Sequence, residues 1–162
     1  MKEFIIQYAS YNLWANKRIA ELIVALDASV LDKEVKSSFP SIRKTVHHIW
    51  DAELIWMARL NGELLSWPPS AQFQSPAINQ FTQTSQAFVS FIEAKDESFL
   101  NSKTTYTNTQ GKQFTNVNSG IITHCMNHST FHRGQLITIL RELGMTQFSA
   151  TDLIVYLRET NK

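Results

Sequence analysis

Residues 124–135 read HCMNHSTFHRGQ and lie inside a longer segment, about 118–143, whose apolar residues recur at helical spacing. The three histidines of this stretch, His124, His128 and His132, stand four residues apart. Four residues turn a helix by about 400°, so successive histidines are offset by about 40° and share one stripe. Imidazole is the commonest metal ligand in proteins, and an i, i+4 pair can hold one ion from one helix. The stretch therefore predicts a long helix with metal ligands along one face.

Three other segments also have the periodicity of amphipathic helices. Together with the first, we expect four long helices, over residues 3–27, 42–60, 76–100 and about 118–143. Threonine and aromatic residues around a glycine predict a short β-hairpin within 103–116, and a short helix with inward-facing Leu153, Ile154, Tyr156 and Leu157 is expected at 151–159. The sequence thus predicts an all-α four-helix bundle, with a hairpin-like insert before the fourth long helix, in a single domain over residues 1–162.

Residues at the expected helix ends support these boundaries. Ser41 precedes the second helix and is a predicted N-cap, because its hydroxyl can accept from a free backbone N–H. Pro76 can occupy the first turn of the third helix, where its missing N–H costs nothing. Gly144 follows the fourth helix and can adopt the left-handed conformation that ends it.

Composition and charge exclude several classes of protein. The net charge of +1 and the lack of a run of lysine and arginine argue against a nucleic-acid-binding protein. No apolar run approaches the roughly 20 residues that a bilayer span requires, and the first residues do not resemble a signal peptide. The one cysteine, Cys125, excludes an intramolecular disulfide and is expected to be a buried small side chain. We expect a cytoplasmic protein that associates with neither membrane nor nucleic acid.

A metal site on the fourth helix needs a ligand from elsewhere, because two histidines bind an ion weakly. The remaining histidines, His47 and His48, are adjacent in the second helix and point about 100° apart, so only one can face the bundle centre. Helical periodicity does not decide between them. His124 lies about 12 Å along the axis from His132, so the three fourth-helix histidines cannot share one ion equally. We interpret His124 as a supporting residue.

Polar residues beside the histidines are candidates for catalysis or support. Glu53 and Asp51 follow the second-helix histidines and can orient a ligating imidazole or act as a general base, although a solvated carboxylate is the simpler interpretation of Asp51. Arg133 is either an anion-binding residue or a surface charge, and Gln135 ends the motif. Gly134 costs a helix about 1 kcal/mol relative to alanine, which a close helix approach or room for a ligand would explain.

These motifs resemble those of the DinB/YfiT-like superfamily of metal-dependent bundle proteins, over nearly the whole length of the chain. The first helix matches in Tyr11-Asn12-Leu13-Trp14-Ala15-Asn16. The second matches in Phe39-Pro40-Ser41-Ile42-Arg43 and in His48-Ile49-Trp50 with Glu53 and Trp56. Tyr106-Thr107-Asn108 with Gly111 fits the hairpin. The most specific match is the fourth-helix signature, which comprises His124, Asn127, His128, His132, Arg133, Gly134 and Gln135.

The resemblance implies an up-down-down-up bundle, commonly a homodimer, with a divalent metal held by three histidines. Transferred to this sequence, those ligands are His48, His128 and His132, with His47 at most a neighbour of the site. Histidine ligands favour zinc or nickel. Characterised members of the superfamily are transferases or isomerases that use a low-molecular-weight thiol such as bacillithiol, mycothiol or glutathione.

The leading functional hypothesis is therefore a metal-dependent enzyme that transfers a small thiol to a small-molecule electrophile. The candidate catalytic residues are Glu53, His124, Arg133 and Gln135. One alternative is a metal-dependent hydrolase. Others are a non-catalytic, metal-binding stress-response bundle and a metal-free interaction dimer.

Overall fold

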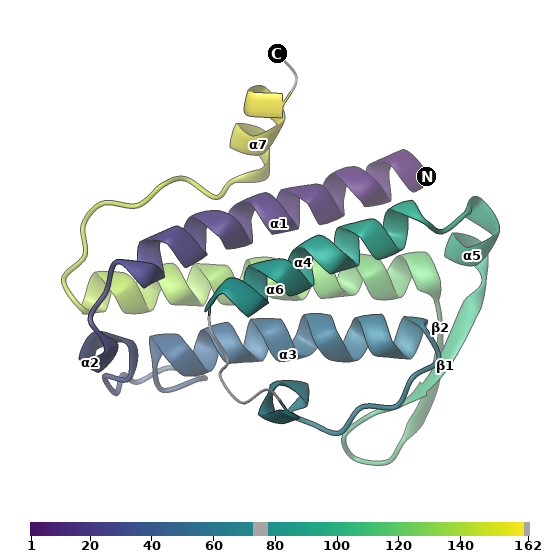
Figure 1. The fold of residues 1–162 in the computed structure, drawn as a ribbon, viewed down its shortest axis with the longest axis horizontal. Helices are drawn as coiled ribbons and strands as arrows, with labels where there is room; N and C mark the ends of the chain where they lie inside the picture. Colours follow the sequence, from purple (N-terminus) through teal and green to yellow (C-terminus); the bar gives the residue numbers. More distant parts are fainter. Residues whose placement is uncertain (73–77, 161–162) are drawn as a thin grey trace.

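A bundle of four long helices forms the body of the molecule (Figure 1). The structure is a computed structural model that describes residues 1–72 and 78–160. The long helices are α1 (Lys2–Val24), α3 (Ile42–Leu60), α4 (Ile78–Glu93) and α6 (Asn118–Glu142). α1 and α6 run in one direction and α3 and α4 in the other, and α1 and α3 each pack against both α4 and α6. The expected all-α bundle and its up-down-down-up order are confirmed.

Shorter elements lie at the ends and along the sides of the bundle. They are α2 (Ala28–Leu31), the 3₁₀ helix η1 (Pro69–Gln72), α5 (Glu97–Asn101), β1 (Lys103–Thr107), β2 (Gln113–Val117) and α7 (Leu153–Thr160). β1 and β2 form the expected antiparallel hairpin, with Lys103 opposite Val117. Two strands alone are marginally stable. The hairpin is supported by Tyr106, whose ring meets the ring of Trp56 on α3 edge to face, with centroids 4.9 Å apart.

Most of the core lies in two apolar halves, which are separated by a layer of buried polar side chains. One half includes Ile5, Leu13, Phe88, Ile92 and Ile122, and the other includes Ile23, Ile49, Phe81, Leu136 and Ile139. Between them, from all four long helices, lie the buried residues Asn12, Asn16, Glu53, Ser85 and Arg133, which we call the polar layer. Burial of such groups is costly unless they are hydrogen-bonded to one another.

Capping residues fix the ends of the helices as expected in two places. The Ser41 side chain accepts a hydrogen bond from the backbone N–H of Lys44 at 3.2 Å, so the predicted N-cap of α3 is confirmed. Gly144 follows α6 with a φ of +93°, a conformation that side chains other than glycine's rarely adopt.

The expected helix over 76–100 is interrupted in the structure. The chain leaves the helical path after Glu93, and Asp96 starts α5 by accepting a hydrogen bond from the Phe99 backbone N–H at 2.7 Å. An aspartate side chain that caps a new helix competes with continuation of the old one. The expected start at Pro76 lies outside the described residues. Similarly, α1 ends at Val24, short of residue 27, and α2 follows as a separate turn.

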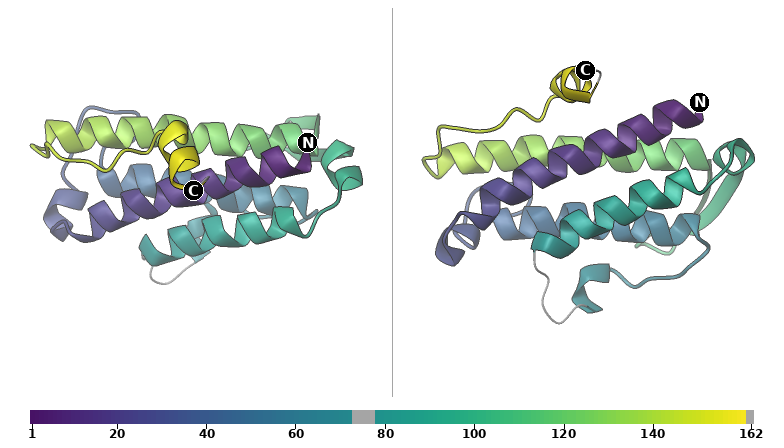
Figure 2. Two further views of the ribbon diagram at one scale, coloured as in Figure 1. Left: turned by 90° about the horizontal axis from the view of Figure 1, so that it is seen from above. Right: turned by 45° about the horizontal axis from the view of Figure 1, so that its top comes forward.

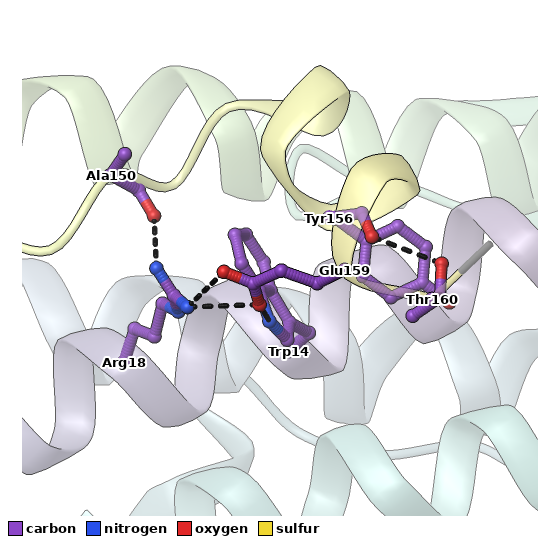
Figure 3. A network of polar contacts seen from close by, with 6 residues as sticks. All are labelled: Trp14, Arg18, Ala150, Tyr156, Glu159 and Thr160. Carbon is purple, nitrogen blue, oxygen red and sulfur yellow. Dashed lines mark hydrogen bonds and ion pairs between the residues drawn. The ribbon is translucent and has the colours of Figure 1, made fainter. Parts of the chain in front are cut away.

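The short C-terminal helix α7 lies against the outer side of α1 (Figures 2 and 3). Arg18 on α1 donates two hydrogen bonds to the Glu159 carboxylate, at 2.8 and 3.0 Å. Its guanidinium also covers the ring of Trp14, which itself donates to Glu159. Polar contacts therefore hold α7 in place alongside aromatic packing.

The apolar residues of α7 are less enclosed than the sequence suggested. Tyr156 is buried, with its ring 5.6 Å from the ring of Trp14. Leu153 and Ile154, expected to face inward, remain 38% and 52% exposed. The inward prediction is wrong for these two because α7 rests on a single helix, which covers only one narrow side of it. In the described part of the chain, no helix has the length and apolar character needed to span a bilayer.

Candidate metal centre

Three histidines from two helices converge on one point at the face shared by α3 and α6. The Nε2 atom of His128 lies 3.0 Å from Nε2 of His48 and 3.1 Å from Nε2 of His132. One ligand atom from each residue lies within 4.8 Å of the other two. We call these three residues the histidine cluster. His132 is buried, and the other two are partly buried.

The helices themselves bring the cluster together. His128 and His132 are one turn apart on α6, and α3 runs antiparallel beside it (Figure 1). His48 comes from α3. His47, the next residue on α3, points elsewhere: its Nδ1 lies 3.4 Å from the Ser70 hydroxyl on η1, and its ring meets Trp50. The choice that periodicity left open between the two second-helix histidines is therefore resolved by packing, with His48 in the cluster.

The donor set fits a divalent metal ion. Two nitrogens at about 2.0–2.1 Å from a tetrahedral ion are about 3.3 Å apart, close to the 3.0 and 3.1 Å that separate Nε2 of His128 from Nε2 of His48 and of His132. Burial lowers the pKa of His48 to about 4 and that of His128 to about 3, with a further contribution from neighbouring His132. The imidazoles are therefore neutral at pH 7, the form that has a lone pair to donate.

Side chains around the cluster hold the rings in place. Gln135 Oε1 accepts a hydrogen bond from Nδ1 of His132 at 2.8 Å, so the lone pair of Nε2 of that ring is available to a metal ion. The ring of Phe39 stacks on His48 with centroids 4.0 Å apart, and Trp67 meets the same imidazole edge on. Both aromatic residues come from the connections on either side of α3, so loops complete a site whose nitrogens come from helices.

The contact between Gln135 and His132 predicts an effect on metal affinity. Replacing Gln135 with methionine is expected to weaken metal binding by about 10–100-fold, because loss of such a hydrogen bond frees the ligating ring. Gln135→Glu keeps an acceptor at the same position and serves as the control, with affinity close to that of the wild type. Competition with a chromogenic chelator measures both constants, and equal weakening by the two variants would contradict an orienting role for the acceptor.

The lowered histidine pKa values predict the pH dependence of metal-free stability. In the unfolded chain these imidazoles titrate near pH 6.5, so below that pH the unfolded state binds more protons than the folded state. The histidine contribution to stability is therefore complete above about pH 6.5 and is lost as the pH falls towards the folded pKa values of about 4 and 3.

Urea unfolding in the presence of a chelator checks this dependence. The midpoint is expected to decrease between pH 7 and pH 5, and the decrease is expected to be smaller in the double variant His48→Gln/His128→Gln. A wild-type midpoint that rises over this interval would contradict the assigned direction.

His124 lies one turn before the histidine cluster on α6 and outside it. Its ring centroid is 6.0 Å from that of His128, and it meets Trp56 edge to face at 5.2 Å. Among the described residues, the group that could hold an ion comprises His48, His128 and His132. His124 therefore neighbours the cluster from the side of the β-hairpin.

Glu53 belongs to the polar layer. Its carboxylate is fully buried and accepts hydrogen bonds from the side chains of Asn12 at 2.6 Å, Asn16 at 2.8 Å and Ser85 at 2.6 Å. These partners come from α1 and α4, whereas His48 faces α6. Burial raises the pKa of Glu53. The hydrogen bonds from Ser85, Asn12 and Asn16 and the positive charge of Arg133 act in the opposite direction and lower it.

Arg133 occupies the other end of the same network. Its guanidinium is buried and donates to the side-chain oxygens of Asn12 and Asn16 at 2.6 and 2.8 Å. The two asparagines therefore bridge a buried cation and a buried anion from α6 and α3. The interpretation of Arg133 as a surface charge is therefore wrong, because the guanidinium is buried, and the bridge of two carboxamides was not predicted. The sequence feature that could have predicted this bridge is the pair of asparagines, Asn12 and Asn16, which lie one turn apart on the apolar side of the first helix.

Two other residues differ from their sequence-based interpretation. Asp51 is buried, and its Oδ1 accepts a hydrogen bond from the Ser70 backbone N–H at 2.6 Å. The interpretation of Asp51 as a solvated carboxylate is therefore wrong. A Cβ added at Gly134 would meet nothing within 4 Å, so a close helix approach does not explain this glycine. Cys125 is buried as expected, and burial raises the pKa of its thiol well above the usual range.

Comparison with known proteins is consistent with these features. The family model of the DinB family matches residues 1–161. Protein DinB from Bacillus subtilis (strain 168) is 27% identical over 167 residues, which cover 97% of this chain and 95% of the relative.

Two solved structures have the same fold. The crystal structure of a DinB-like protein from Bacillus subtilis superposes with a TM-score of 0.66 at 18% identity, over 90% of this chain and 97% of the other. A DinB-like protein from Bacillus cereus ATCC 10987 gives a TM-score of 0.62 at 16% identity, over 91% and 96% of the two chains. From the match along almost its entire length, together with the three converging histidines, we conclude that the chain belongs to the DinB family.

Proposed function

We propose that this protein is a metal-dependent enzyme that transfers a small thiol to an electrophilic small molecule. The observation that carries the proposal is the convergence of three Nε2 atoms from His48, His128 and His132. When bound there, a divalent ion, zinc or nickel by the chemistry of its ligands, would lower the pKa of an incoming thiol or water. The thiol reaction is supported by the resemblance to thiol-dependent members of the superfamily.

The residues of the chain support this chemistry in separate ways. Three protein ligands are the number typical of a catalytic zinc site, which leaves a position for a substrate. Gln135 keeps the donor nitrogen of His132 directed at the cluster, and Phe39 limits access of water to His48 by stacking on its ring. His124 lies beside the cluster and lines a hollow at the protein surface. It is therefore the candidate to accept or donate a proton.

An activity screen tests the proposal. Protein purified without an affinity tag is analysed for metal and then assayed with bacillithiol, mycothiol or glutathione against a panel of electrophiles. We expect about one metal ion per chain and thiol consumption that is lost in His128→Ala. Stoichiometric metal without turnover of any thiol would favour a hydrolase or a non-catalytic metal-binding role instead. Absence of metal from the wild-type protein would overturn the proposal.

The molecular context of the enzyme is proposed on the same basis. We infer a single-domain cytoplasmic protein, without a nucleic-acid or membrane partner, that assembles as a homodimer. Large exposed apolar side chains, Phe4, Phe131 and Ile154, are available for such an association. Sedimentation equilibrium distinguishes the dimer from a monomer.

A further inference from the structure

A hollow next to the histidine cluster has the features of a binding site for an aromatic group. Its volume is about 510 Å³, and it is lined by Trp56 of α3, Tyr106 of β1, Asn116 and Val117 of β2, and Gly120, Ile121 and His124 of α6. We propose that it binds a planar aromatic group of the substrate, with neutral or negative charge, while the reacting atom lies at the cluster. This assignment deepens the proposed function and rests on it for the identity of the reaction.

The hollow and the histidine cluster both lie along the pair of helices α3 and α6. His124 is one helical turn from His128, and their ring centroids are 6.0 Å apart. On the opposite helix, Trp56 is two turns from His48, or about 12 Å along the axis. An aromatic ring in the hollow beside His124 is therefore about one turn, or roughly 6 Å, from the nearest histidine of the cluster, a distance that a short substituent of the ring can span.

The walls of the hollow are aromatic and already in place. Trp56 meets the rings of Tyr106 and His124 edge to face, at centroid distances of 4.9 and 5.2 Å. The Arg59 guanidinium lies over both Trp56 and Tyr106 and donates to the Thr107 carbonyl at 3.0 Å, which fixes the two rings from behind. Aromatic groups prefer stacked or edge-on aromatic neighbours, and sites of about 300–1,000 Å³ hold small molecules.

The charges near the hollow disfavour a cationic ligand. No aspartate or glutamate is among the described residues that line it. The Arg59 guanidinium lies over the rings of Trp56 and Tyr106, at 4.5 and 5.0 Å from their centroids. A positively charged aromatic ligand would find no counter-ion there, whereas a carboxylate on the ring would be attracted.

Gly120 provides a way to fill the hollow without damaging the fold. It lies within α6, is exposed, and a Cβ built on it meets nothing within 4 Å. Glycine costs a helix about 1 kcal/mol relative to alanine, so a leucine here is expected to preserve or raise stability. Gly134 on the same helix is also exposed with an unobstructed Cβ, but it lines a different hollow with Tyr8, Tyr11 and Leu153. Gly134→Leu is therefore a matched control.

The experiment measures binding of benzoate, cyclohexanecarboxylate and benzylammonium by tryptophan fluorescence and by saturation-transfer NMR. We expect the wild type to prefer benzoate over the other two by at least about fivefold. Gly120→Leu is expected to raise the Kd for benzoate by about tenfold or more without lowering the Tm, and Gly134→Leu to change it by less than about twofold. An unchanged Kd in Gly120→Leu, equal binding of the saturated acid, or no benzoate binding at about 10 mM would overturn the assignment.

Measurement on metal-free and metal-loaded protein separates this inference from the proposed function. Benzoate binding that depends on Gly120 in the metal-free protein supports the hollow even if no metal-dependent activity is found. Conversely, an active metalloenzyme in which Gly120→Leu leaves the KM for an aromatic electrophile unchanged would overturn the aromatic subsite and leave the metal centre intact.

Discussion

Replacement of His132 by alanine is expected to remove stoichiometric metal from the protein. His132 is the buried member of the histidine cluster, and its Nε2 lies 3.1 Å from that of His128. Without it, one histidine from each helix remains, and two ligands do not hold a divalent ion firmly. Loss of a supporting hydrogen bond alone costs about 10–100-fold in affinity, so loss of a ligand is expected to exceed about 100-fold. Elemental analysis and chelator competition measure the change.

His124→Ala is the matched control for this prediction. It removes an imidazole from the same face of α6, one turn beyond His128, and is expected to retain about one metal ion per chain. His47→Ala serves the same purpose on α3, because His47 contacts Ser70 and Trp50 instead of the cluster. If His124→Ala and His132→Ala lost metal equally, the ion would be held by a different set of residues.

Replacement of Arg133 by methionine is expected to destabilise the fold by about 3–5 kcal/mol, because it removes one partner of a buried charge network. The side chain is 2% exposed and donates to Asn12, Asn16 and Thr130. Its loss leaves the Glu53 carboxyl group buried without a compensating cation and two carboxamide oxygens without donors. For a chain of this size, each kcal/mol shifts Tm by about 2–4 °C, so a decrease of about 10 °C is expected.

A double-mutant cycle and a surface control test that explanation. Glu53→Gln removes the buried anion, and in the Arg133→Met background it is expected to cost less than it does alone. Arg18→Met breaks the partly exposed pair with Glu159 (Figure 3) and is expected to cost less than about 1 kcal/mol. If Arg133→Met were no more destabilising than Arg18→Met, the polar layer would not contribute to stability as described.

The parts of the structure predictable from the sequence are those governed by local spacing. The four long helices and the boundaries at Ser41 and Gly144 depend on residues within a turn or two of each other, and they are confirmed, although α1 and α4 end earlier than predicted. The spacing of His128 and His132 likewise places both rings on one face of α6. Assignment of His48 required information from outside the helix, first from a family resemblance and then from the packing of α3 on α6.

Features that depend on distant contacts were not predictable in this way. Asp51 has the composition of a surface carboxylate, and its burial follows from a contact with Ser70, nineteen residues away in sequence. Phe39 and Trp67 belong to irregular connections, and no periodicity places their rings on His48. The bridge of Asn12 and Asn16 between Arg133 and Glu53 joins three helices, so it exists only after they pack.

The parallel arrangement of α3 and α4 has a consequence for how such a site can diversify. Because both helices run the same way, the chain after α3 must return along the bundle before α4 begins (Figure 1). Part of that return segment, η1, is held to α3 by Asp51, and Trp67 just before it covers His48. Loops tolerate substitutions and insertions that helices do not. The surroundings of His48 can therefore be changed through this segment without altering the helices that carry the histidine cluster.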